Sequence, residues 1–204
     1  MTALLVATRN RKKLAELTRV LEIADIGGLE LLSLDDVAPY PEAPETGATF
    51  EENALAKARD GFTATGLPTL ADDSGIEIDA LNGMPGVLSA RWAGSHGADS
   101  ANYELVLAQL GDVPDERRGA AFVSVCALVV GPDVADTVVT RGEWPGTIAR
   151  IPNGTEGFGY DPVFLPLGET RSAAQLSGAE KDQLSHRGRA LALLVPTLGA
   201  LAKG

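Results

Sequence analysis

A cluster of cations follows the first apolar run of the chain. The stretch TRNRKK carries Arg9, Arg11, Lys12 and Lys13 where helical spacing of leucines begins. The amino end of a helix favours anions, so cations gathered there lose stability unless an anion lies among them. A bound phosphate would remove that conflict, because helix N–H groups and basic side chains bind it together. A solvated charge run is the alternative, but in an acidic chain, directly after a buried strand, we favour the phosphate site.

Two adjacent carboxylates form a second candidate centre. Asp72 and Asp73 follow a short apolar run in LADDSG, and Ser74 comes next. Adjacent strand residues point to opposite faces, so we expect the two carboxylates to have different tasks. One of them would bind a hard divalent cation or deprotonate water. A turn is the alternative, because Asp, Ser and Gly bond their own backbone in turns; beside a phosphate site the motif indicates metal-assisted hydrolysis.

Two later motifs offer groups that suit a nucleotide. In GFGYDP, glycines flank Phe158 and let the backbone expose an aromatic ring on which a planar base could stack, although the same residues also mark turns. In LSHRGRA, Ser185 can cap a helix whose first turn carries His186 and Arg187. Guanidinium and backbone donors in that position suit carbonyl or phosphate oxygens; an exposed basic helix end is the alternative interpretation.

The elements that must position these groups alternate between strand and helix. Apolar runs and alternation predict strands at 3–7, 29–34, 76–78, 120–130 and 136–142, and the last two flank a Gly-Pro-Asp turn, as in an antiparallel hairpin. Helical spacing predicts helices at 14–24, 50–65, 102–110 and 178–201. In the second of these, Thr49 and Glu52 form a capping-box pattern, while Gly66 and Pro68 end it. Pro196 predicts a kink or break in the last helix.

This order of elements predicts one α/β domain over residues 1–204. We expect an extended mixed sheet with flanking helices, two lobes and a ligand site beyond the carboxyl ends of strands. The connection DDVAPYPEAPETGA contains three prolines, so it is predicted to be a long exposed loop. The candidate chemical groups fall in the connections and at the ends of these elements.

Composition excludes several classes of protein. Seventeen Lys and Arg against 28 Asp and Glu give a net charge of −11, which argues against binding nucleic acid or a membrane surface. One cysteine, Cys126, and two His cannot form an intrachain disulfide or a structural Cys/His zinc site, so a metal would be bound mainly by oxygen. The apolar start is too short for a secretory leader or a membrane span, so we expect a soluble cytoplasmic protein. Motifs of P-loop enzymes, Rossmann dehydrogenases and serine hydrolases are absent.

Six sequence blocks resemble one family of enzymes almost end to end. The chain is similar to the noncanonical purine nucleoside triphosphate pyrophosphatases (inosine/xanthosine triphosphate pyrophosphatases) in TRNRKK, PETGATFEENALAKA, LADDSGI, NGMPGVLSARWAG, GFGYDPVF and LSHRGRAL. The resemblance implies an α/β homodimer with a Mg²⁺-dependent site in a cleft between two lobes. It also implies hydrolysis of ITP, XTP and their deoxy forms at the α–β phosphate bond, which removes deaminated purines from the nucleotide pool.

The resemblance further implies roles for individual residues. Asp73 would be the proton acceptor and a Mg²⁺ ligand, with Glu45 as a second ligand. Arg9 stands where the family often has Gly, and Lys12 where it has a small residue, so for these two and Arg11 the backbone is expected to line the site. The remaining residues would contact the triphosphate or sugar (Thr8, Asn10, Lys13, Lys57, Ser74, Lys181) or the base (Phe158, Gly159, Tyr160, Asp161, His186, Arg187).

Two other functions remain compatible with the same residues. One is a regulatory protein that binds nucleotides without turnover, against which Asp73 and the Glu45 loop argue. The other is a related pyrophosphatase that acts on pyrimidine or methylated nucleotides. Release of pyrophosphate from ITP and from dTTP in the presence of Mg²⁺ separates these functions.

Overall fold

The protein is built on one mixed sheet. The computed structural model describes residues 1–42 and 44–204, without the side chains at 179, 182 and 183. The six strands lie in the order β2-β1-β3-β4-β5-β6. Strand β1 pairs in parallel with β2 and β3, whereas β5 pairs antiparallel with β6, which confirms the mixed sheet. The strands are β1 (Thr2–Val6), β2 (Leu29–Leu32), β3 (Thr69–Ile78), β4 (Gly119–Val129), β5 (Thr137–Ile148) and β6 (Phe164–Pro166).

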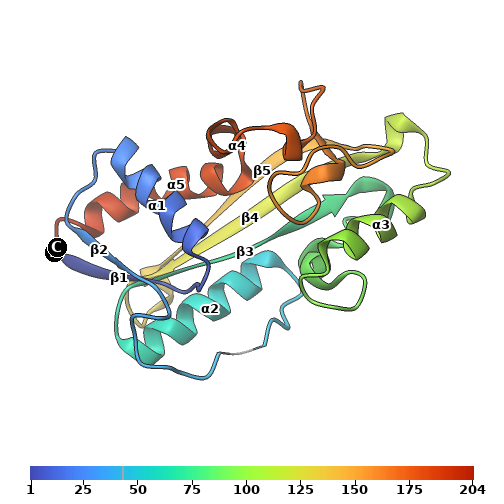
Figure 1. Ribbon diagram of the computed structural model, residues 1–204. Coiled ribbons are helices and arrows are strands. Elements are labelled where there is room, and N and C mark those ends of the chain that lie inside the picture. The colour runs from blue at the N-terminus through green and yellow to red at the C-terminus, as the bar shows by residue number, and fades with distance from the viewer. Residues whose placement is uncertain (43) are drawn as a thin grey trace. The chain divides into compact units, whose positions relative to one another are not determined.

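Helices flank this sheet (Figure 1). Their order along the chain alternates with the first strands, as the α/β pattern predicts. No helix in the described residues is both long and apolar enough to span a bilayer. The helices are α1 (Arg11–Ile23), α2 (Phe50–Thr65), α3 (Asp99–Gln109), α4 (Gly178–Leu184) and α5 (His186–Leu201).

The chain folds into two compact units, each assembled from separate segments. Unit 1 contains Met1–Asp73, Ser124–Gly142 and Arg187–Gly204. Unit 2 contains Ser74–Val123 and Glu143–His186. The boundaries fall inside β3, β4, β5 and α5, so single elements contribute residues to both units.

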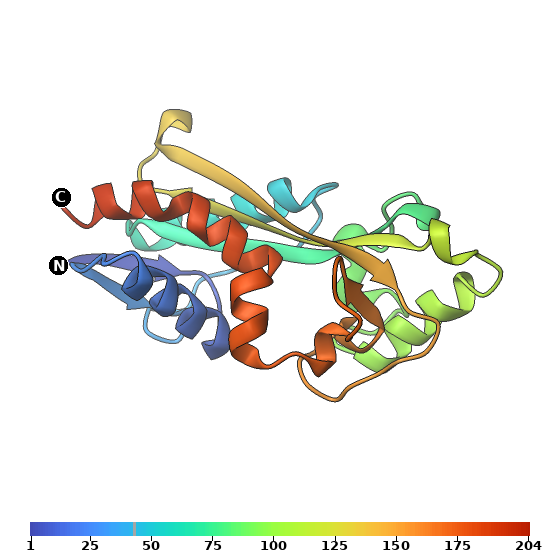
Figure 2. The same cartoon turned by 90° about the horizontal axis from the view of Figure 1, so that it is seen from above.

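In unit 1, the alternation of strand residues divides the side chains between two faces of the sheet. Leu4 and Val6 of β1 join Leu70 of β3, Cys126 of β4 and the leucines of α1 and α5 in one buried cluster. Figures 1 and 2 show α1 and α5 on one face of these strands and α2 on the other. Because side chains alternate along β3, Asp72 points to the face of α1 and α5, and Asp73 points toward α2.

Unit 2 has its own core of aromatic and aliphatic side chains. Ile76 and Ile78 of β3 pack there with Val106 of α3. Phe122 of β4 lies edge-on to Phe164 of β6, with ring centroids 4.7 Å apart. This edge-to-face contact is a favoured geometry for aromatic rings. The core supports the segment from 149 to 163 that carries the aromatic loop.

Helix α2 has the bounds that its sequence predicts. The Thr49 hydroxyl accepts a hydrogen bond from the Glu52 N–H at 3.2 Å, which satisfies one of the free donors at the helix start. Gly66 takes a left-handed conformation, with φ of 69°, and ends the helix. The predicted loop before it has neither helix nor strand at 33–42 and 44–48, and position 43 lies outside the described residues.

Three local predictions need correction. Strand β3 continues through LADDSG, so the turn interpretation of that motif is wrong. Strand β5 reaches Ile148 instead of ending at 142, because the short strand β6, which the prediction missed, pairs with its last residues. The C-terminal helical segment is interrupted at Ser185, whose backbone is extended, and Pro196 lies inside α5.

Candidate active site

The first candidate group lies at the amino end of α1, where polar side chains cap the helix. Asn10 has an extended backbone, and its Oδ1 accepts a hydrogen bond from the Lys12 N–H at 3.0 Å. The Asn10 N–H in turn donates to the Thr8 hydroxyl at 3.1 Å. These two side chains therefore hold the β1–α1 connection in place and satisfy two of its N–H groups.

Carboxylates balance part of the positive charge at this helix start. Arg9 forms an exposed ion pair with Glu42, with 2.6 Å between Nη2 and Oε1. Lys13 Nζ lies 2.6 Å from Oδ2 of Asp72. Lys12 is exposed to solvent. The basic cluster therefore consists of several separate cations, of which Lys13 contacts Asp72 in the amino-terminal half of β3.

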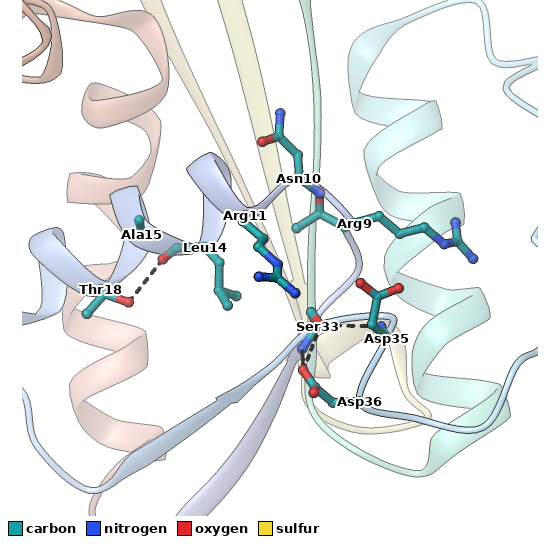
Figure 3. A pocket seen from close by; sticks show the side chains of 10 residues that line it. Arg9, Asn10, Arg11, Leu14, Ala15, Thr18, Ser33, Asp35 and Asp36 are labelled. Atoms are coloured by element: carbon teal, nitrogen blue, oxygen red, sulfur yellow. Dashed lines mark hydrogen bonds between the residues drawn. The ribbon is translucent and has the colours of Figure 1, made fainter.

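A pocket of about 370 Å³ lies beside the same connection (Figure 3). In Figure 3 the Arg11 side chain extends toward the turn at Ser33, Asp35 and Asp36, whereas Asn10 points away from that turn. The Ser33 hydroxyl and backbone N–H, and then the charge of Arg11, lower the pKa of Asp36. The pocket is lined by Thr8, Arg9, Asn10, Arg11, Leu14, Ala15, Thr18, Ser33, Asp35 and Asp36.

Asp72 lies in a buried network of charges between β3, α1 and α5. Its Oδ1 accepts a hydrogen bond from Arg187 Nη2 at 3.1 Å, and its Oδ2 accepts one from Lys13 Nζ. Arg187 also pairs with Glu16 of α1, with 3.2 Å between Nε and Oε2. Burial alone would raise the pKa of Asp72, but the positive charges of Arg187 and Lys13 outweigh it and hold that pKa well below its ordinary value. Asp72 therefore favours the ionised form more strongly than an ordinary carboxyl group does.

Asp73 has different surroundings on the opposite face of β3. Its Oδ2 accepts a hydrogen bond from the side-chain amide of Asn53 at 3.0 Å, and its Oδ1 lies 3.3 Å from Lys57 Nζ. Burial raises the pKa of Asp73, and although Lys57 and Asn53 act in the opposite direction, the pKa stays above the ordinary value of a carboxyl group. A carboxylate whose pKa is raised is a stronger base than an ordinary carboxylate.

Lys57 joins Asp73 to Glu45 in the preceding loop. Its ammonium contacts both Glu45 Oε1 and Asp73 Oδ1. Burial lowers the pKa of Lys57, but Asp73 and Glu45 outweigh that effect and the pKa is raised. The described residues contain no group of three or more His, Cys, Asp and Glu side chains that could hold a metal. The carboxylates of Glu45 and Asp73 share the Lys57 ammonium as their counter-ion.

Asn53 is a site residue that the sequence argument missed. It is buried, and besides its bond to Asp73 its Oδ1 accepts a hydrogen bond from the Gly47 N–H at 2.8 Å. A Cβ atom at Gly47 would lie 2.6 Å from that Oδ1, so the close approach requires glycine. Asn53 precedes Lys57 by four residues, and this helical spacing on one face of α2 was the signal that could have identified it.

In unit 2, the GFGYDP motif forms an exposed aromatic loop. Phe158 is 66% exposed, and Lys181 Nζ lies 5.1 Å from its ring centroid. Lys181 also forms an ion pair with Asp161, whose Oδ2 accepts a hydrogen bond from the Phe158 N–H at 2.8 Å. The Gly159 N–H donates to Asp99 at 2.7 Å, a contact that the sequence argument did not predict.

The remaining predicted residues have more varied positions. Tyr160 is buried in the core of unit 2, with its hydroxyl donating to the Ser89 carbonyl at 2.8 Å. The His186 ring stacks on Phe122, with centroids 5.1 Å apart. Ser74 lies in β3 and is partly buried. The structure thus brings Lys13 to Asp72, and Glu45 and Lys57 to Asp73, and it joins Phe158, Asp161 and Lys181 in unit 2.

Comparison with known proteins yields relatives along nearly the whole chain. A sequence model described as the Ham1 family matches residues 4–197. The dITP/XTP pyrophosphatase of Mycobacterium tuberculosis is 71% identical over 204 residues, which cover 100% of this chain and 98% of the relative. The dITP/XTP pyrophosphatase of Nocardia farcinica is 68% identical over 202 residues, covering 99% of this chain and 97% of the relative.

Solved structures agree with the fold. A HAM1 protein from Coxiella burnetii has a TM-score of 0.90 at 40% identity, covering 98% of this chain and 100% of that one. The crystal structure of the nucleoside-triphosphatase / dITP/XTP pyrophosphatase from Mycobacterium abscessus has a TM-score of 0.81 at 63% identity, covering 97% and 100%. Identity of this extent, together with the family match, leads to one conclusion: this chain belongs to the Ham1 family.

Proposed function

We propose that this chain is a dITP/XTP pyrophosphatase. It hydrolyses ITP, dITP, XTP and dXTP at the α–β phosphate bond, releases the monophosphate and pyrophosphate, and thereby removes deaminated purines from the nucleotide pool. The observation that carries the proposal is Asp73, a buried carboxylate with a raised pKa held by Asn53 and Lys57. This chain is also 71% identical over its whole length to the dITP/XTP pyrophosphatase of Mycobacterium tuberculosis.

In the proposed reaction, Asp73 accepts a proton from water. The water oxygen then bonds to the α-phosphorus, and the bond from that phosphorus to the α–β bridging oxygen breaks, so pyrophosphate leaves. A raised pKa brings Asp73 closer to the operating pH, which makes it a better base than an ordinary carboxylate. Asn53 and Lys57 keep its two oxygens in fixed directions.

The triphosphate is proposed to bind to the cations that contact Asp72 and Asp73 and to the start of α1. Lys13 reaches the side chain of Asp72 and Lys57 reaches its backbone carbonyl, and both cations would offset the phosphate charges. The amino end of α1, which Thr8 and Asn10 hold in place, favours an anion through the helix dipole. Ser74 and Lys181 complete the proposed set, with the backbone of Arg9, Arg11 and Lys12.

The base is proposed to stack on Phe158. The exposed ring is held by a loop whose other members, Gly159, Tyr160 and Asp161, fix its backbone. His186 and Arg187 would supply donors to the 6-carbonyl that inosine and xanthosine share. Adenine carries a donor amino group at that position, so donors facing it would remain unpaired and discriminate against ATP.

Mg²⁺ is the metal that we propose for this site. Glu45 and Asp73 already contact one shared positive charge, the Lys57 ammonium, so the two carboxylates fit a small cation with few protein ligands. A bound Mg²⁺ would neutralise phosphate charge in the transition state. The residues that would hold it are Asp73 and Glu45.

We also propose that the chain acts as a homodimer in the cytoplasm, as its relatedness to nucleotide pyrophosphatases suggests. Sedimentation equilibrium measures the first property, and localisation of the tagged protein measures the second. A monomer at micromolar concentration would contradict the dimer. The catalytic residues described above all belong to one chain, so their roles do not depend on this result.

Pyrophosphate release from a panel of ITP, dITP, XTP, dTTP and ATP tests the proposal. We expect rapid release from the first three and slow release from dTTP and ATP, with activity lost in excess EDTA and restored by Mg²⁺. Binding of ITP without turnover would instead indicate a regulatory protein. Preference for dTTP would indicate a pyrimidine pyrophosphatase, and full turnover in EDTA would refute the metal requirement.

A further inference from the structure

The two peptide groups on either side of Phe158 are each held by a different carboxylate. The Phe158 N–H donates to Asp161 Oδ2 at 2.8 Å, and the Gly159 N–H donates to Asp99 Oδ2 at 2.7 Å. Asp161 belongs to the same motif, but Asp99 is the first residue of α3, 60 residues away along the chain. All of these residues belong to unit 2.

The orientation of the Phe158 ring depends on these backbone anchors. With 66% of the residue exposed, core packing does little to fix the side chain. The neighbouring residues Gly157 and Gly159 have φ of 82° and 61°, and glycine restricts the backbone less than any other residue. Hydrogen bonds to its peptide groups therefore do most to keep this loop in one conformation.

We infer that Asp99 is a positioning residue that orients Phe158 for stacking against the nucleobase. The inference rests on the proposed function, because it gives Asp99 a task only if a purine base binds at Phe158. Asp99 makes no contact with substrate in this account. It acts through the Gly159 peptide group, and its removal loosens one side of the aromatic loop while Asp161 and Lys181 still hold the other.

A structural role for Asp99 must be separated from this one. An acidic residue in the first turn of a helix interacts favourably with the helix dipole, which alone would explain an Asp at the start of α3. Ser100, the next residue, is exposed and also lies in the first turn. Moving the carboxylate to that position keeps the acid at the helix start and removes the acceptor for Gly159.

Three variants and two ligands form the test. The variants are Asp99→Ala, Asp99→Asn, and Asp99→Ala combined with Ser100→Asp. The ligands, titrated calorimetrically into the full chain, are IMP, which carries the base, and inorganic pyrophosphate, which does not. KM and kcat for ITP are measured alongside, and thermal melting shows whether each variant is folded.

We expect Asp99→Ala to weaken IMP binding and raise the KM for ITP by about 5- to 20-fold, in line with the loss of one hydrogen bond to a charged acceptor. Binding of pyrophosphate should change less than about 2-fold. The double variant should bind IMP as weakly as Asp99→Ala even where it melts like the unmodified chain. Asp99→Asn, which keeps an acceptor oxygen but not the charge, should recover most of the IMP affinity.

The outcomes distinguish this inference from the proposed function. If the unmodified chain neither binds IMP nor hydrolyses ITP, the proposed function fails, and the inference fails with it. If the unmodified chain does both and Asp99→Ala binds IMP equally well, only the inference is overturned. It is overturned too if the double variant recovers IMP binding, or if IMP and pyrophosphate weaken by the same factor.

Discussion

Asp72 and Asp73 are chemically identical neighbours with opposite electrostatics. Asp72 faces α1 and α5, where Arg187 and Lys13 both bond to it, and its pKa is lowered despite burial. Asp73 faces α2, where it contacts Asn53 and Lys57, and Lys57 is shared with Glu45. These two partners do not outweigh the effect of burial, so the pKa of Asp73 is raised. Asp72 is a counter-ion to Arg187 and Lys13, and we propose that Asp73 is the base that accepts a proton.

The difference teaches that strand geometry alone can divide tasks between adjacent residues. Strand β3 continues through both carboxylates, so each points to a different layer of helices. The number of cations in each layer then sets the direction of each pKa shift. The following predictions ask whether this division into a structural and a chemical carboxylate is real.

The largest effect is expected for Asp73→Asn. The amide keeps the shape but cannot accept a proton or hold a cation, so ITP turnover should fall at least ~10²-fold. Thermal melting at pH 7 should be unchanged or raised, because a carboxyl whose pKa is raised by folding opposes folding when it is charged. Steady-state pyrophosphate release and calorimetric melting check the two parts. Wild-type turnover in this variant would remove Asp73 from the reaction.

For Asp72→Asn we expect the reverse balance. Arg187 and Lys13 would lose their shared counter-ion, and removal of one partner of a buried ion pair costs about 3 to 5 kcal/mol. For a chain of this size the melting temperature should fall by roughly 10 °C. The folded fraction should lose less turnover than Asp73→Asn does. An exchange of phenotypes between the two variants would invert the comparison.

The pH dependence of the same pair gives an independent check. Folding lowers the pKa of Asp72, so its stabilisation is complete above its ordinary value of about 4 and is lost as pH falls through the lower, folded value. The stability difference between the unmodified chain and Asp72→Asn should therefore be constant from pH 5 to 7 and shrink in acid. Urea unfolding at several pH values measures it, and a difference that grew below pH 4 would contradict the assigned direction.

Arg187→Ala tests whether a residue on the Asp72 side of the sheet also contributes to substrate selection. If Arg187 donates to the 6-carbonyl, kcat/KM for ITP should fall by about 10-fold or more while the slow ATP reaction changes little. Loss of its bonds to Asp72 and Glu16 should also lower the melting temperature. Equal slowing of ITP and ATP would instead mean that Arg187 acts on the phosphates or on folding.

A smaller loss of turnover is expected for Asn53→Leu in α2, on the Asp73 side of the sheet. The substitution removes the amide donor to Asp73 and the acceptor for the Gly47 N–H, so turnover should drop by about 10-fold. Arg59→Ala, at an exposed position of the same helix, is the matched control and should behave like the unmodified chain. Wild-type kcat in Asn53→Leu would show that Asn53 serves the fold alone.

The sequence predicted elements well where nearby residues determine their ends, and poorly where a strand depends on pairing with a distant strand. Helix α2 has its predicted bounds because Thr49 and Gly66 act within one turn of its ends. Strand β6 was missed because three residues carry no period, and its existence depends on β5. The sequence pattern placed the end of β5 at Gly142, yet the Pro145 carbonyl further along still accepts a hydrogen bond from the Leu167 N–H at 2.9 Å.

The candidate site follows the same rule. The opposite directions of Asp72 and Asp73 could be predicted, because alternation along a strand is local. Their partners could not, since Arg187 lies 115 residues from Asp72. Asp99 is invisible to motif analysis for the same reason, because only the fold places it against Gly159.

The segmented composition of unit 1 has a consequence for synthesis on the ribosome. Its hydrophobic cluster combines Leu4 and Val6 with Leu191, Leu194 and Leu198, so the cluster cannot close until nearly all of the sequence has been translated. Unit 2 contains no residue after His186, so all of its residues are translated before those of α5 that complete the cluster of unit 1. During translation the apolar side chains of β1 therefore lack their partners from α5. Contacts between residues so far apart in sequence slow folding and expose the chain to aggregation. We therefore expect unit 1, which contains the first residues to be translated, to complete its core after unit 2 does.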